Sequence, residues 1–125
     1  MMKRIFAAGI LMVMLLLSSC NSYSAIGLVR SSIGGEASMK FVSFKGHQSF
    51  TLFADSDDTA IEYEATLDEG EMTVYYYDGD IEKLLFTIRG GDRVDSELYY
   101  GGGNLRIKLV ADEKCRGGSF EFELD

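Results

Sequence analysis

Residues 61–77 read IEYEATLDEGEMTVYYY, and this stretch decides the fold class. Apolar side chains alternate with polar ones on both sides of segment 68–71, first at Ile61, Tyr63, Ala65 and Leu67 and then at Met72, Val74 and Tyr76. Strict alternation sends successive side chains to opposite faces of a strand, so each run has one buried and one solvated face. Gly70 can supply the positive φ of a tight turn. The stretch therefore predicts two half-buried strands joined as a hairpin.

The same period of two recurs further along the chain, at Leu105, Ile107 and Leu109 and again at Phe120, Phe122 and Leu124. Asp78-Gly79 is a strong hairpin signal before residues 81–89, where we expect Leu84, Phe86 and Ile88 to face inward. Further strands are expected over 39–44, 48–54 and 97–100. No long stretch has a helical period, which disfavours a parallel α/β fold. The sequence predicts an all-β fold, an antiparallel β-sandwich of about eight strands, either jelly-roll-like or immunoglobulin-like.

The N-terminus follows a different pattern. Lys3 and Arg4 precede an apolar run over 5–17, which is shorter than the roughly 20 residues of a membrane-spanning helix. A basic start followed by a short apolar run is typical of a secretory signal peptide. An uncleaved membrane anchor is the alternative. The run ends in Leu17-Ser18-Ser19-Cys20, which resembles the lipobox of bacterial lipoproteins in its large aliphatic residue three places before a cysteine and its small residues between.

This resemblance implies three modifications. A diacylglyceryl group is transferred to the thiol of Cys20, a lipoprotein signal peptidase cuts between Ser19 and Cys20, and the freed amine can be acylated. Two acyl chains anchor a protein stably without spanning the bilayer. We expect a cell-envelope protein on an outer membrane or on the outer face of a plasma membrane. Its parts would be a leader over 1–19, a lipidated cysteine with a flexible tether over 20–35, and the domain over 36–125. Within the tether, 25–29 could add a short edge strand.

Charge and cysteine content narrow the class of partner. The chain has a formal net charge of −8, and loss of Lys3 and Arg4 with the leader makes it more negative. This opposes binding to nucleic acid, so no nucleic-acid partner is expected.

With Cys20 lipidated, Cys115 has no partner for an internal disulfide. It is then a buried apolar group, a free thiol or a site of intermolecular pairing, and we favour an inert thiol because no acid–base partner lies beside it in the sequence.

Residues 69–80 (EGEMTVYYYDGD) and 117–124 (GGSFEFEL) resemble the small, glycine- and acid-rich β-sandwich domains of bacterial lipoproteins. The resemblance brings no catalytic residues, so we expect a non-enzymatic structural or interaction domain. A relay through the single histidine, His47, would need Ser43, Ser49 or Cys115 as the nucleophile, and none lies in a recognisable nucleophile turn.

Two weaker candidate sites remain. Tyr75 and Tyr77, with Tyr99 or Tyr100, could form an exposed aromatic platform that holds a sugar or a peptide, from a glycan or a protein of the envelope; the alternative is cross-strand packing. Asp55, Asp57 and Asp58 form a carboxylate-rich loop that could bind Ca²⁺, although these residues are also ordinary turn formers. We favour the turn, and expect no cofactor beyond the covalent lipid.

Overall fold

The computed structural model describes residues 12–13 and 23–125, so the lipobox and its Ser19 and Cys20 lie outside the described residues. Every strand pairing is antiparallel. In this part of the chain, no helix is long and apolar enough to cross a membrane. The strands are β1 (Met12–Val13), β2 (Tyr23–Ile26), β3 (Val29–Ile33), β4 (Glu36–Leu52), β5 (Ala60–Glu69), β6 (Glu71–Asp78), β7 (Ile81–Arg89), β8 (Arg93–Tyr99) and β9 (Leu105–Leu124).

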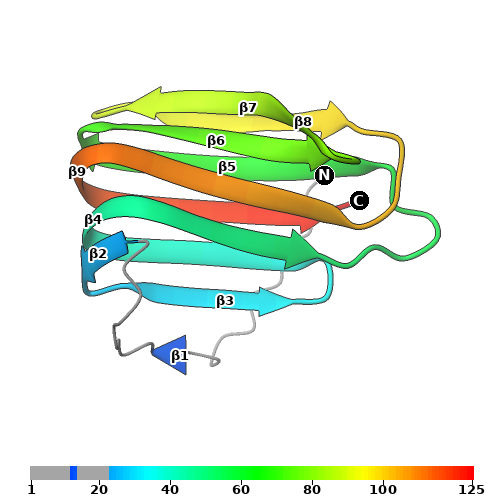
Figure 1. The fold of residues 1–125 in the computed structure, drawn as a ribbon, viewed down its shortest axis with the longest axis horizontal. Helices are drawn as coiled ribbons and strands as arrows, with labels where there is room; N and C mark the ends of the chain where they lie inside the picture. Colours follow the sequence, from blue (N-terminus) through cyan, green and yellow to red (C-terminus); the bar gives the residue numbers. More distant parts are fainter. Residues whose placement is uncertain (1–11, 14–22) are drawn as a thin grey trace.

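Two long strands, β4 and β9, run through both layers of the molecule (Figure 1). We predicted each of them as two separate strands. Instead, β4 bends at a register shift between Phe44 and Gly46, and β9 continues through 112–118 with Gly117 at φ 64°. A bulge bends a strand without ending it. The glycines and charged residues that suggested loops therefore mark bends in continuous strands.

The bends divide the sheet into two packed layers with a jelly-roll strand order. In the first layer, β3 is followed by the first half of β4, the second half of β9, then β5 and β8. In the second layer, the second half of β4 is followed by the first half of β9, then β6 and β7. The predicted all-β, antiparallel sandwich is confirmed, in its jelly-roll-like form.

The predicted hairpin across 68–71 is wrong. β5 pairs with β8 and β9, whereas β6 pairs with β7 and β9, so the chain crosses from one layer to the other at Gly70. Gly70 has φ 102°, and a Cβ there would lie 2.6 Å from the Cys115 Sγ, so glycine is required. Alternation reports which side chains face inward, but not which strand is the partner. The second predicted hairpin is confirmed, because Asp78 pairs with Ile81 around Gly79.

One apolar core fills the space between the layers. Met72 and Val74 are fully buried as predicted, and Tyr63 stacks on Phe86 with 5.1 Å between ring centroids. Leu84 was predicted to face inward, but 59% of it is exposed. The pairing of β6 with β7 shifts register between Val74 and Tyr75, and this irregularity turns Leu84 outward.

Residues 23–33, which we predicted as part of a flexible tether, form β2 and β3 on the edge of β4. The expected edge strand over 25–29 is thus close to what forms, but the ordered domain begins well before residue 36. Tyr23 stacks on the buried Phe44 with 6.0 Å between ring centroids. Serine and glycine suggested a loop here, yet the pairing with β4 compensates for their low strand propensity.

Candidate functional site

The outer surface of the second layer carries aromatic and basic side chains in cross-strand register. Tyr75 lies opposite Lys108, and Tyr77 lies opposite Arg106. On the other side of β6, Glu82 of β7 lies opposite Tyr77. These five residues are called the aromatic–basic face below. The predicted alternation holds here, because Val74 points into the core while Tyr75 and Tyr77 point outward and are half-buried.

The two cations of this face lie over the two rings. The guanidinium carbon of Arg106 is 4.4 Å from the centre of the Tyr77 ring, and the Lys108 Nζ is 5.5 Å from the centre of the Tyr75 ring. Both distances are within the range of cation–π attraction. These contacts restrict the orientation of both rings.

Glu82 completes the network. Its carboxylate accepts a hydrogen bond of 2.8 Å from the Tyr77 hydroxyl and forms an ion pair of 2.8 Å with Lys108 Nζ. The hydrogen bonds from Lys108 and Tyr77 lower the pKa of Glu82, and the same bond to Glu82 raises the pKa of Lys108. The face thus offers hydrogen-bond donors, an acceptor and aromatic rings in one patch.

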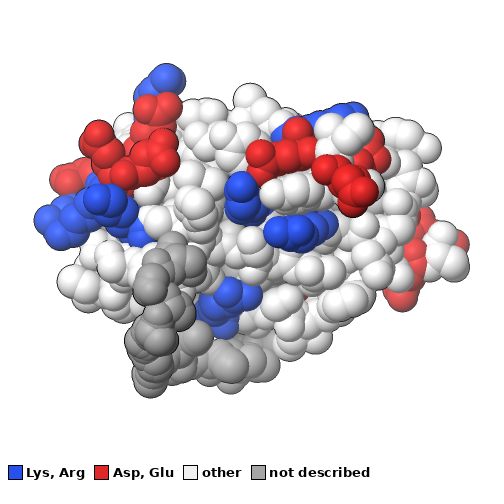
Figure 2. Space-filling model, in the orientation of Figure 1, with Lys and Arg blue, Asp and Glu red and all other residues white. Residues whose placement is uncertain are grey.

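The two strands that carry the tyrosines and the cations, β6 and the first half of β9, have no free backbone edge. β6 is paired on both sides, by β7 and β9, and the first half of β9 is paired by β6 and β4. A ligand over the tyrosines and the cations is consequently held by side chains, since strand addition needs an exposed edge, and β7, which pairs with β6 alone, provides that edge one strand away. Figure 2 shows basic groups near the centre of the view and acidic groups gathered toward its ends.

Tyr99 and Tyr100, predicted as partners of the tyrosine patch, belong to the other layer. Tyr99 ends β8, which pairs with β5, and 74% of it is exposed. Tyr100 is partly buried and donates its hydroxyl to the carbonyl of Gly103 in the following loop. Burial raises the pKa of Tyr100. The four predicted tyrosines therefore divide into a pair on β6 and a separate pair at the end of β8.

The predicted calcium loop, 53–59, is closed by its own hydrogen bonds. The Asp58 carboxylate accepts from the backbone N–H of Asp55 at 2.9 Å, and the Asp58 N–H donates to the Asp55 carbonyl at 3.1 Å. These are the contacts of a turn that is capped by aspartate. Asp57 is exposed. The loop geometry thus matches the turn-forming role that we favoured.

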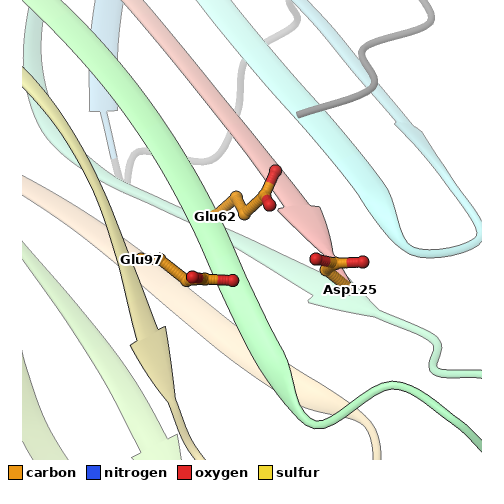
Figure 3. A group of neighbouring side chains, drawn as sticks. All are labelled: Glu62, Glu97 and Asp125. Carbon is orange, nitrogen blue, oxygen red and sulfur yellow. The ribbon is translucent and has the colours of Figure 1, made fainter. Parts of the chain in front are cut away.

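A different carboxylate cluster was missed by the sequence analysis. Carboxylate oxygens of Glu62, Glu97 and Asp125 lie within 4.8 Å of one another on the outer surface of the first layer (Figure 3). Burial, then repulsion from Asp125 and a hydrogen bond to it, and repulsion from Glu97 raise the pKa of Glu62. The alternating glutamates were visible in the sequence, but their register across β8, β5 and β9 was not.

The residues considered for hydrolysis do not assemble. His47 and Ser49 are both exposed on β4, and in the described part of the chain no hydrogen bond joins them. Cys115 is fully buried in the bend of β9, with its Sγ 3.4 Å from the carbonyl oxygens of Glu71 and Glu113. Burial raises its pKa, so the reactive thiolate is disfavoured. The predicted inert, buried thiol agrees with this environment.

The sequence matches no protein-family model and no curated protein. The structure is similar to that of protein NMB1881 from Neisseria meningitidis, with 16% identity and a TM-score of 0.39 over 82% of this chain and 87% of that one. It is also similar to TmCBM61 in complex with β-1,4-galactotriose, with 13% identity and a TM-score of 0.41 over 78% of this chain and 69% of that one. A CBM4 structure is similar as well, with 11% identity and a TM-score of 0.45 over 82% of this chain and 78% of that one. At such values no ligand carries over, so function is inferred from the residues of this chain.

Proposed function

We propose that this chain is a lipid-anchored, non-enzymatic domain of the bacterial cell envelope that binds carbohydrate on its aromatic–basic face. The lipobox resemblance at Leu17 to Cys20 supports the anchor. The single observation that supports binding is the register that places Tyr75 and Tyr77 beside Lys108 and Arg106 on an outward face.

The chemistry of the face favours a sugar over a peptide strand. β6 and the first half of β9 are paired on both sides, so a peptide could add as a strand only along the free edge of β7, one strand away from Tyr75 and Tyr77. Tyrosine combines an apolar ring with a hydroxyl, which suits the mixed apolar and hydroxylated surface of a sugar ring. Arg106 and Lys108 donate hydrogen bonds, while Glu82 accepts them. Because Arg106 and Lys108 already restrict the rings, the two tyrosine side chains lose little further conformational entropy when a ligand binds.

The test is a glycan array probed with the mature protein and with a Tyr75→Ala/Tyr77→Ala variant. We expect glycan binding that falls at least about tenfold in the double variant, equivalent to about 1.4 kcal/mol. Tyr99→Ala is the matched control, because it removes an exposed tyrosine from the other layer. Its binding should equal that of the unmodified protein.

Thermal unfolding of each variant shows whether the domain remains folded. A blank array would overturn the carbohydrate proposal. Equal losses in the double variant and in Tyr99→Ala would overturn the assignment to the aromatic–basic face.

A further inference from the structure

Exposed aliphatic side chains gather at one edge of the sandwich, on β2, β3 and the adjoining half of β4. They are Ile26, Val29, Ile33 and Val42, with 62%, 37%, 55% and 59% of each exposed. They make up half of the large apolar side chains that are exposed among the described residues. These four residues are called the apolar edge below. Figure 1 places β2 and β3 at the side of the molecule opposite β7 and β8.

The strand register places Val29 and Val42 on one face of the sheet, and Ile26, opposite Ser43, lies at the turn beside Val42. Val29 lies opposite Lys40, and Val42 follows Lys40 by two residues, on the same face. A Cβ on Gly27 would lie 2.8 Å from the Val42 side chain, so Val42 lies against the turn that follows Ile26. At the far end of β3, Ile33 lies opposite Glu36. An exposed apolar strip of this kind, bordered by polar groups, marks an interaction surface.

The length of chain before β2 identifies what this edge meets. Only Asn21 and Ser22 separate Cys20 from Tyr23, the first residue of β2. Three residue steps span at most about 11 Å, so a lipid on Cys20 holds β2 within that distance of the bilayer surface. The flexible tether that we predicted over 20–35 would have allowed the domain any orientation relative to the membrane. Because β2 and β3 form within this range, almost no flexible chain remains between the lipid and the domain.

The charges beside Val29 and the β2–β4 pairing favour the same orientation, whereas the Ile33 end of the edge borders Glu36. Lys40 lies opposite Val29, Lys45 lies opposite Ser24, and both lysines are exposed. Lysines next to apolar groups suit a membrane surface that contains anionic lipids. The carboxylates of Glu62 and Glu97 lie on β5 and β8, toward the other edge of the same layer, where repulsion would keep them away from such a surface.

We infer that the apolar edge of the mature protein rests on the membrane surface, which directs β7 and the aromatic–basic face away from the bilayer. This rests on the lipid anchor in the proposed function, and not on carbohydrate binding. In the full chain, β1 pairs with β3 at Val29 and Arg30. Cleavage before Cys20 would remove β1 and leave this edge open to the bilayer.

The chain contains no tryptophan, so single tryptophans report position without background. The full chain would be expressed in a bacterium, and the mature Ile26→Trp, Val42→Trp and Leu84→Trp variants reconstituted in phosphatidylethanolamine–phosphatidylglycerol vesicles with brominated acyl chains. We expect roughly twofold quenching at positions 26 and 42, because interfacial apolar groups enter the boundary of the acyl region. Leu84 is as exposed as Val42 but lies on β7, so its tryptophan should not be quenched.

Mass spectrometry of Cys20 and flotation with the vesicles distinguish a failure of the edge inference from a failure of the lipid anchor. A lipidated protein that floats, but shows no quenching at 26 or 42, overturns the edge inference and leaves the anchor intact. A blue-shifted but unquenched tryptophan at 26 and 42 shows that another protein surface covers the edge, which also overturns it. An unmodified Cys20 in a protein that does not float overturns the anchor, and the edge inference with it.

Discussion

The two outer faces of the sandwich follow the same alternation but have opposite electrostatic character. On the second layer, each cation lies beside a tyrosine, and Glu82 lies between Tyr77 and Lys108. On the first layer, carboxylates meet carboxylates across the strands: Glu97, Glu62, Glu123 and Glu36 form one row, and Asp95, Glu64 and Glu121 form the next. Opposite charges across a strand pair stabilise a sheet and like charges destabilise it.

Strand β9 makes this difference visible within one segment. Its first half places Arg106 and Lys108 on the aromatic–basic face, and its second half places Glu121 and Glu123 on the acidic face. Both halves bury the same kind of aliphatic or aromatic residues in the core. The electrostatic difference between the two faces therefore comes from the outward-facing residues of the strand and not from its core residues. A surface that serves only solubility needs no such separation.

The largest effect is expected where the shared strand bends between the two faces. A Cβ on Gly118 would lie 2.2 Å from the buried ring of Phe41, so Gly118→Ala forces the ring or the strand to move. We expect a loss of about 1–3 kcal/mol in the free energy of unfolding, measured by denaturant titration. Ser119→Ala, one residue along the strand, is the matched control. Equal stability of Gly118→Ala and the unmodified protein would show that Phe41 moves aside freely.

A smaller effect of opposite sign is expected on the acidic face. Burial and the nearby Asp125 and Glu97 raise the pKa of Glu62 in the folded protein. Its folded state therefore binds a proton more tightly than its unfolded state, and stability falls as pH rises from about 4.3 through the raised pKa. Glu62→Gln should stabilise the protein at pH 7 by less than about 1 kcal/mol, because these carboxylates are largely hydrated. The control is Glu113→Gln, on a glutamate outside this cluster.

The gain from Glu62→Gln should shrink as the pH falls through the raised pKa of Glu62 and should be lost below about 4.3, where Glu62 is protonated in both states. Denaturant midpoints at several pH values measure this. A gain that does not change with pH would mean that repulsion among the three carboxylates is not its cause.

The sequence predicted side-chain facing better than strand pairing. Alternation placed Val74 inward and Tyr75 outward correctly, because facing depends only on the local period. It failed at Leu84, where the register shift in the pairing with β6 changes the phase of the strand. The partners of β5 and β6 depend on the bends of β9, which no local pattern in the sequence reports.

The candidate site was predicted in part for the same reason. Tyr75 and Tyr77 could be assigned to one face, since they are two residues apart on one strand. Arg106 and Lys108 were missed as their neighbours, because that contact depends on which strand lies beside β6. The acidic rows were missed likewise, although every glutamate in them stood at an alternating position.

The smallest effect on stability is expected when one arginine is replaced on each face. On the acidic face, Arg93 lies 2.5 Å from the Glu64 carboxylate and 3.3 Å from that of Asp95, and its side chain is exposed. Arg93→Ala should cost up to about 1 kcal/mol at low salt. The Debye length falls from about 10 Å at 0.1 M salt to about 3 Å at 1 M, so this loss should largely disappear in 1 M NaCl.

Arg106→Ala should cost about 0.5–1 kcal/mol through its contact with Tyr77. Most of that loss should persist in 1 M NaCl, because the planar guanidinium that lies over the ring also stacks on it. Denaturant titrations of both variants at the two salt concentrations measure the difference. The same salt dependence in both would mean that charge alone holds Arg106 in place, and that the tyrosine rings are not fixed by stacking.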